Sequence, residues 1–105
     1  MSDRAYKQGG HVWFHCPGCE CAHRVRVEIP VDPHYVDSGH WTWNGRLDLP
    51  TFAPSVRTWS GTVDGVDQRV CHSYVLDGQI QFLGDCWHAL AGQTVDLPAW
   101  EPGTL

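Results

Sequence analysis

The chain is poor in basic residues and in long apolar runs, and these shortages exclude several classes of protein. Of its 105 residues, 7 are Lys or Arg and 12 are Asp or Glu, so the formal net charge is −5. Because phosphate affinity comes mainly from clustered Lys and Arg, a general nucleic-acid-binding protein is disfavoured. No apolar run approaches the ~18 residues that span a membrane, and residues 1–10 lack the apolar core of a signal peptide. We therefore expect a protein kept in a reducing cytoplasm.

The composition favours one small domain built mainly from strands. The 11 glycines and 7 prolines disfavour long helices, and 42% hydrophobic residues suffice for one modest core. We expect a flexible leader over residues 1–10, a single zinc-binding β domain over residues 11–98 and a tail over residues 99–105. The predicted fold class is mainly β and zinc-ribbon-like, with at most one short helix.

Hairpins are expected in three places along the chain. His11–His15 and the alternating stretch Ala22–Ile29 are predicted to pair across a tight turn. Trp41–Trp43 leads into Asn44-Gly45, a strong hairpin turn, with residues 46–49 as the return strand. Asp77-Gly78 joins Val70–Leu76 to Gln79–Leu83.

The last hairpin sets the direction of the side chains around it. Counting outward from its turn pairs Val75 with Ile80 and Cys71 with Gly84, so Cys71 faces the core and His72 faces outward. Residues 85–92 are predicted to form one or two turns of helix, and residues 93–97 a final strand.

A pair of cysteines separated by two residues is the clearest sign of a metal site. Cys16-Pro17-Gly18-Cys19 is a tight turn that directs both sulfurs to one side. In a reducing compartment such a pair more often holds zinc than forms a disulfide, and no thioredoxin-like pattern surrounds it. Zinc requires four ligands in a tetrahedron. Cys16 and Cys19 are therefore predicted to supply two of them.

The other two ligands are expected from far along the chain. Cys71 with His88 or Cys86 would close the site across the sheet, and the choice between Cys86 and His88 stays open. Cys71 as an ordinary buried thiol is an alternative, as is His88 paired with Asp85. Cys21 and His23 are close in sequence to the Cys16–Cys19 turn, but a chain rarely folds back tightly enough for such near neighbours to complete the same site. The sequence therefore predicts one zinc ion that is bound by both the N-terminal and the C-terminal hairpin and so connects them.

A second, more open site is a weaker alternative. His72, Asp85 and His88 can form a His and carboxylate set that leaves a coordination position for water, as in metal-dependent hydrolases. The sequence lacks H-E-x-x-H, and no Ser–His–Asp ordering or phosphate-cradling glycine loop is evident. An enzyme is therefore less expected than a binding protein, and no catalytic residue is assigned.

The aromatic residues allow two interpretations. Trp41 and Trp43 lie two apart, so on a strand they share one face and can form a stacking surface for a ligand or partner. Filling a small core is the favoured alternative. Together with Arg24 and Arg26 the tryptophans also allow a nucleic-acid-binding zinc ribbon, against which the net charge counts.

Several motifs resemble a family of small phage and prophage proteins of unknown function. The resemblance extends from Trp13 to Trp100 and is carried by Cys16–Cys19 and by segments 41–45, 50–55, 71–74 and 77–98. Trp87 stands where relatives have Thr in Asp-Cys-Thr-His. Some members carry the label "ammonia monooxygenase" without support.

The resemblance implies a context rather than an activity. We expect a zinc-binding protein in the cytoplasm of a bacterial host cell, or associated with a virion, that binds a host or phage protein. The expected roles are host takeover, anti-defence or virion accessory function. Metal-dependent hydrolysis and nucleic-acid binding are the alternatives.

Overall fold

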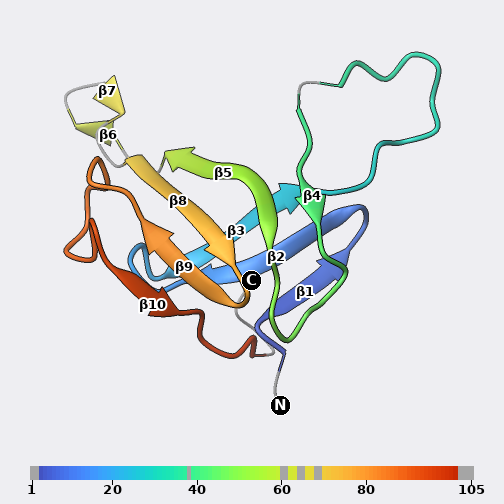
Figure 1. The fold of residues 1–105 in the computed structure, drawn as a ribbon. Coiled ribbons are helices and arrows are strands. Elements are labelled where there is room, and N and C mark those ends of the chain that lie inside the picture. The colour runs from blue at the N-terminus through green and yellow to red at the C-terminus, as the bar shows by residue number, and fades with distance from the viewer. Residues whose placement is uncertain (1–2, 38, 60–61, 64–65, 68–69, 102–105) are drawn as a thin grey trace.

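Two antiparallel β-sheets and a small separate hairpin make up the described part of the chain. The structure is a computed structural model that describes residues 3–37, 39–59, 62–63, 66–67 and 70–101. These residues form ten strands and no helix, which confirms the mainly β fold class (Figure 1). Within them, no helical segment has the length and apolarity that a membrane-crossing helix needs.

The first sheet contains three strands in the order β1-β2-β3. These are β1 (Ala5–Gln8), β2 (His11–Cys16) and β3 (Cys21–Arg26). The β2–β3 hairpin was predicted, but β1 occupies residues expected to be a flexible leader. Gly9 and Gly10, with φ of 60° and 81°, turn the chain back so that Ala5 pairs with Phe14. A two-glycine turn therefore recruits the start of the chain into the sheet.

The second sheet contains five strands in the order β10-β9-β8-β5-β4. Its members are β4 (Thr42–Trp43), β5 (Phe52–Trp59), β8 (Val70–Leu76), β9 (Gln79–Phe82) and β10 (Thr94–Asp96). Asp77 and Gly78 have φ of 50° and 76°, the positive values that the predicted turn requires. The predicted Val75–Ile80 pairing is confirmed. A separate two-stranded hairpin, β6 (Thr62–Val63) and β7 (Val66–Asp67), lies between β5 and β8 in the chain.

Three local predictions were wrong. The pairing of Cys71 with Gly84 does not occur, because the β8–β9 ladder ends at Ser73 and Phe82. Residues 46–49 form no return strand, and β4 pairs instead with Phe52 and Ala53. Residues 85–92 form isolated turns rather than a helix, because their side chains are held by different neighbours on the two faces of β8.

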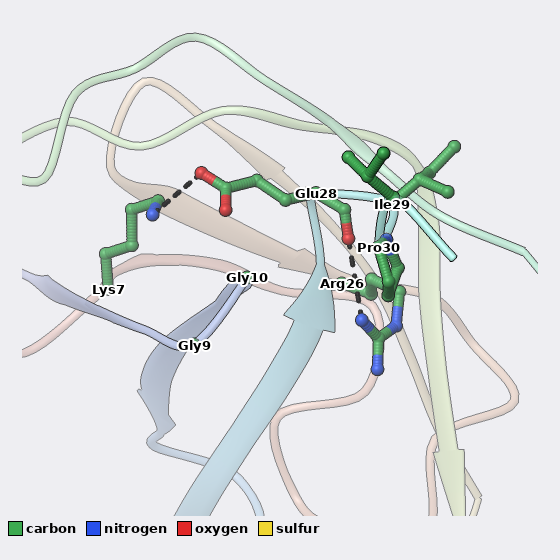
Figure 2. Close-up of a pocket in the computed structure, with 8 residues that line it drawn as sticks. Lys7, Gly9, Gly10, Arg26, Glu28, Ile29 and Pro30 are labelled. Carbon is green, nitrogen blue, oxygen red and sulfur yellow. Dashed lines mark hydrogen bonds and ion pairs between the residues drawn. The ribbon is translucent and has the colours of Figure 1, made fainter. Parts of the chain in front are cut away.

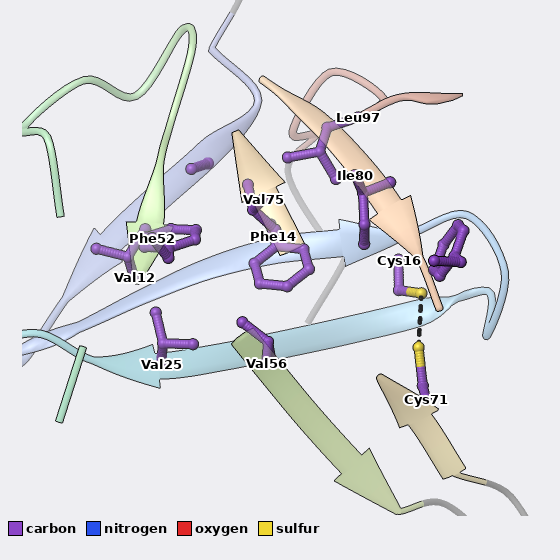
Figure 3. Close-up of a cluster of buried hydrophobic side chains, with 12 residues drawn as sticks. Val12, Phe14, Cys16, Val25, Phe52, Val56, Cys71, Val75, Ile80 and Leu97 are labelled. Carbon is purple, nitrogen blue, oxygen red and sulfur yellow. Dashed lines mark hydrogen bonds between the residues drawn. The ribbon is translucent and has the colours of Figure 1, made fainter. Parts of the chain in front are cut away.

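The core lies between the two sheets (Figure 3). Alternate residues of β2 point into it, and the Phe14 ring stacks on Phe52 of β5 with centroids 5.8 Å apart. At one end of this core Cys16 of β2 meets Cys71 of β8, and both are buried. The two sheets therefore touch through aromatic rings at the centre and through sulfur at the end.

Candidate functional site

Four of the predicted metal ligands meet at the sulfur end of the core. One ligand atom from each of Cys16, Cys19, Cys71 and His88 lies within 4.8 Å of the others. Cys16 Sγ is 3.8 Å from Cys71 Sγ, and Cys71 Sγ is 3.5 Å from His88 Nε2. None of the five cysteines forms a disulfide. This cluster can hold a metal ion.

The two measured distances match the edges of a tetrahedral zinc site. Zn–S bonds of ~2.3 Å and a Zn–N bond of ~2.0–2.1 Å place two sulfurs about 3.8 Å apart and a sulfur and a nitrogen about 3.5 Å apart. The Cys16–Cys71 and Cys71–His88 distances have these values. These two pairs of donor atoms are therefore spaced for a cation of this size, and the other pairs lie within 4.8 Å.

The turn between β2 and β3 presents the first two sulfurs to this point. The Glu20 amide donates to the Cys16 carbonyl at 2.8 Å, and the Cys19 amide donates to Cys16 Sγ at 3.3 Å. A Cβ at Gly18 would overlap the His88 ring. Only a residue without a side chain leaves room for the imidazole against the knuckle.

We expect Gly18→Ala to abolish metal binding and, because the chain without metal is expected to unfold, to lose its cooperative thermal transition. The added methyl displaces His88 from the cluster. Gly84→Ala is the matched control, because a Cβ there meets no atom within 4 Å. Metal content and thermal melts of both variants check this. Full metal content in folded Gly18→Ala would contradict the assignment of His88.

Without a cation, the sulfurs of the cluster cannot all ionise. Hydrogen bonding from Cys71 lowers the pKa of Cys16 to about 4. Burial raises the pKa of Cys19 to about 11, and donation to Cys16 raises the pKa of Cys71. A divalent cation replaces the thiol protons and stabilises all three thiolates.

The His88 ring is fixed by packing on both sides. It makes edge contacts with Phe82 and Trp87, whose ring centroids lie 4.4 and 5.7 Å away. Its Nδ1 accepts a 3.3 Å hydrogen bond from the Leu90 amide, which leaves the proton of the neutral ring on Nε2, facing Cys71. A metal ion held by His88 through Nε2 would take the place of this proton.

A second set of side chains lies on the opposite, outer side of β8. Ser55 Oγ is 2.8 Å from His72 Nε2, and Asp85 Oδ2 is 3.4 Å from His72 Nδ1. With the ring proton on Nδ1 facing the carboxylate, Nε2 accepts the Ser55 hydroxyl proton. This is the order of nucleophile, base and carboxylate found in serine hydrolases. No Ser–His–Asp ordering was evident in the sequence, and the fold brings these three residues together from separate elements.

An irregularity in β5 brings Ser55 to this position. The β5–β8 register shifts between Phe52 and Val56, so Ser55 sits in a bulge that follows Pro54. Proline has no amide hydrogen to continue the ladder, and bulges re-aim side chains beside active sites. The Trp41 indole donates to the Ser55 carbonyl at 3.2 Å and holds the bulge from the other side.

One loop joins the Ser55–His72–Asp85 set to the metal-ligand cluster. The Leu83 amide donates to the His72 carbonyl at 2.9 Å. The Cys86 sulfur accepts from the His72 amide at 3.3 Å and donates to its carbonyl at 3.1 Å. Asp85 lies in the sequence between Leu83 and Cys86, the two residues bonded to the His72 backbone, and His88 comes two residues after Cys86. Fixing His88 in the cluster therefore also restricts Asp85 beside His72.

The predicted ligands thus separate into two groups. His88 lies with Cys16, Cys19 and Cys71, whereas Cys86 bonds to the backbone of His72. His72 and Asp85 lie together as the alternative site required, but their third member is Ser55 and not His88. The alternating side-chain direction of β8, which separates Cys71 from His72, explains the division.

The tryptophans and arginines that were considered as binding surfaces make contacts within the protein instead. Trp41 and Trp43 are half-buried and pack against the core, and the Trp43 indole donates to the Arg46 carbonyl at 3.0 Å. Arg24 lies over the Trp13 ring and Arg26 over the Tyr35 ring, at 5.4 and 5.5 Å from the centroids. These contacts favour a packing role for both tryptophans.

An open pocket of about 390 Å³ lies at the β1–β2 turn, away from both groups (Figure 2). Lys7 pairs with Glu28 at 2.8 Å across it, and Arg26 Nη1 donates to the Glu28 carbonyl at 3.5 Å. Lys7 and the Glu28 carboxylate pair with each other, and Arg26 bonds to a backbone carbonyl. No residue of this pocket therefore points to a catalytic or binding role.

The described residues form a small all-β protein of two sheets that carries a Ser55–His72–Asp85 set on its outer side. The chain belongs to the bacterial ubiquitination-like system serine protease family (BubE), whose family model matches residues 1–83. The matched range includes Ser55 and His72 and ends just before Asp85. Neither the curated proteins nor the solved structures contain a match. The family is a bacterial one, and phage origin stays a prediction.

Proposed function

We propose that this protein is a serine protease that cleaves the bond at the C-terminus of a ubiquitin-like protein. The observation that carries the proposal is the contact of Ser55 with His72 at 2.8 Å, with Asp85 beyond the ring. The family description supports this choice of substrate class, since it names a ubiquitination-like system. A bond of this kind is a peptide or isopeptide amide.

The chemistry follows from the positions of the two ring nitrogens. His72 Nε2 takes the Ser55 proton as Oγ attacks the carbonyl carbon, and it then gives that proton to the leaving amine. Water hydrolyses the resulting acyl ester with His72 again acting as base. Asp85 stabilises the imidazolium and keeps the Nδ1 proton directed toward itself. The His72 ring thus carries the proton from the attacking Ser55 hydroxyl to the leaving amine, and later from the attacking water to Ser55 Oγ.

We propose zinc as the ion of the Cys16, Cys19, Cys71 and His88 cluster, in a structural role. Three thiolates and one imidazole close a tetrahedron and leave no position for water, which is typical of structural zinc. The cluster holds the sheets together and fixes the loop that carries Asp85. The ion itself takes no part in hydrolysis.

Cleavage of a ubiquitin-like protein carrying a C-terminal fluorogenic amide tests the proposal. The substrate protein should come from a bacterial ubiquitination-like system, the kind of system that the family description names. We expect release of the fluorophore by the purified, zinc-loaded chain. The proposed function would be contradicted if the folded, zinc-loaded chain left this amide bond uncleaved although the ubiquitin-like substrate was itself folded.

Asp85→Asn should lower kcat by roughly 10²-fold, less than the ~10⁴-fold loss seen when a buried triad aspartate is replaced. The Asp85 side chain is 52% exposed and 3.4 Å from Nδ1, so solvent replaces part of its effect. Asp96→Asn is the control, because Asp96 lies on β10 and bonds to Gln79. Steady-state kinetics of both variants check this, and an unchanged kcat in Asp85→Asn would remove Asp85 from the mechanism.

The metal-dependent hydrolase expected as an alternative makes a different prediction. It requires His88 to act with His72 and Asp85, but His88 Nε2 faces Cys71. A metal mechanism would tolerate Ser55→Ala, whereas the serine mechanism would not. The predicted binding of a host or phage protein stays a prediction, and a ubiquitin-like substrate would itself be a protein partner.

A further inference from the structure

A second group of metal-ligand atoms adjoins the first and shares Cys19 with it. One ligand atom from each of Cys19, Cys21 and His23 lies within 4.8 Å of the other two. Neither Cys21 nor His23 takes part in the proposed protease or in the first zinc site. The sequence analysis set Cys21 and His23 aside as ligands that complete the Cys16–Cys19 site, and the first group does not contain them; they gather around Cys19 alone.

The backbone of Glu20 explains how three residues so close in sequence converge. Glu20 has a φ of 58°, a left-handed conformation that non-glycine residues rarely adopt. It turns the chain sharply between Cys19 and the start of β3 at Cys21. Alternate residues of a strand share a face, so Cys21 and His23 then point to the same side. The turn brings the Cys19 sulfur to that side as well.

The His23 ring has an unmet bonding requirement. His23 is only 7% exposed, and its Nε2 is buried without a hydrogen-bond partner among the described residues. Most buried polar atoms in proteins have a partner, because leaving one without a partner costs free energy. A cation bound by the ring would supply what the protein does not.

Charge balance favours a second cation at the same place. Three thiolates and one divalent ion leave an excess negative charge at the first site, where Cys16 and Cys71 are buried. Buried charge is costly unless it is paired. Adding the Cys21 thiolate and a second divalent ion gives four thiolates for two ions, which is neutral.

We propose that Cys21, His23 and the shared Cys19 thiolate bind a second divalent cation of the zinc class. Cys19 then bridges two ions. With three protein ligands, a zinc ion here would keep one of its four positions open for water or another ligand. This inference rests on the first zinc site and does not depend on the protease.

Metal counting on the full chain tests it. The protein is stripped, reduced, reloaded with Zn²⁺ or Co²⁺ beside a weak competing chelator, and measured by native mass spectrometry. We expect two ions in the unaltered chain and one in Cys21→Ser, which changes an exposed residue and leaves the first site complete. His23→Asn should also bind one. Cys86→Ser is the matched control for metal count and should keep two.

Two results would overturn the proposal. One is an unaltered chain that binds a single ion, or none, at saturation. The other is Cys21→Ser that still binds two. With Co²⁺, the thiolate charge-transfer absorption should gain a second increment in the unaltered chain and lack it in Cys21→Ser. The two tests are independent: the chain can bind two ions and yet cleave no substrate, and it can cleave the substrate and yet bind only one ion.

Discussion

Ser55→Ala should lower kcat for the fluorogenic ubiquitin-like substrate by about 10⁴-fold or more, with the fold and the metal content unchanged. The variant loses the nucleophile, and a water molecule in its place is not held by a covalent bond to the bulge as Oγ is. Ser55 is half-buried and its hydroxyl makes one contact, with His72, so stability should change by about 1 kcal/mol or less. Stopped assays over hours measure the residual rate.

Ser73→Ala is the matched control for this experiment. Ser73 follows His72 on β8 and is buried on the core face, so its hydroxyl cannot reach the substrate. The variant should keep kcat within a few-fold even where its stability falls. If Ser55→Ala retains activity while Ser73→Ala also does, Ser55 is not the nucleophile.

Removing the metal should unfold the protein. Structural zinc contributes roughly 10–16 kcal/mol of apparent binding free energy, and a domain of this size has a total stability of about 5–15 kcal/mol. The cluster connects β2, β8 and the loop after β9, which otherwise meet only through a modest core. Cys16→Ser should have the same effect. Circular dichroism during titration with a chelator measures the loss.

His34→Ala is the control for a lost imidazole, since His34 is exposed in a loop outside the cluster. It should melt with the unaltered protein and retain its metal. A chain that stays folded after complete metal removal, shown by elemental analysis, would contradict the structural role. Activity should disappear together with the fold, because the same loop carries Asp85 and His88.

The sequence predicts most of the second sheet and the grouping of the cysteines. Asp77-Gly78 fixes the β8–β9 register, and that register turns Cys71 inward toward the Cys16–Cys19 knuckle. Both inferences use local rules, namely turn type and strand alternation. They needed no knowledge of the other sheet.

The nucleophile could not be predicted in this way. Ser55, His72 and Asp85 come from a bulge, a strand and a loop, so no local motif connects them. Alternation did place His72 on the outer face, and Asp85 was considered with it. A serine directly after Pro54 was the remaining sign, since proline interrupts a ladder and favours a bulge.

The loop of residues 85–92 failed as a helix for a related reason. Its local sequence fits helical turns, but Cys86 bonds to the His72 backbone while His88 is drawn toward Cys71. Contacts with two sides of one strand override the local preference. Such contacts are visible only once β8 is in place.

Labelling with a fluorophosphonate probe tests the central claim most directly, because the probe forms a covalent bond only with an activated serine. Intact-mass and peptide analysis of the zinc-loaded protein should find one adduct, on Ser55. The adduct should be absent from His72→Ala. A folded, zinc-loaded protein with no adduct, or with its adduct on another residue, would contradict the Ser55–His72–Asp85 assignment.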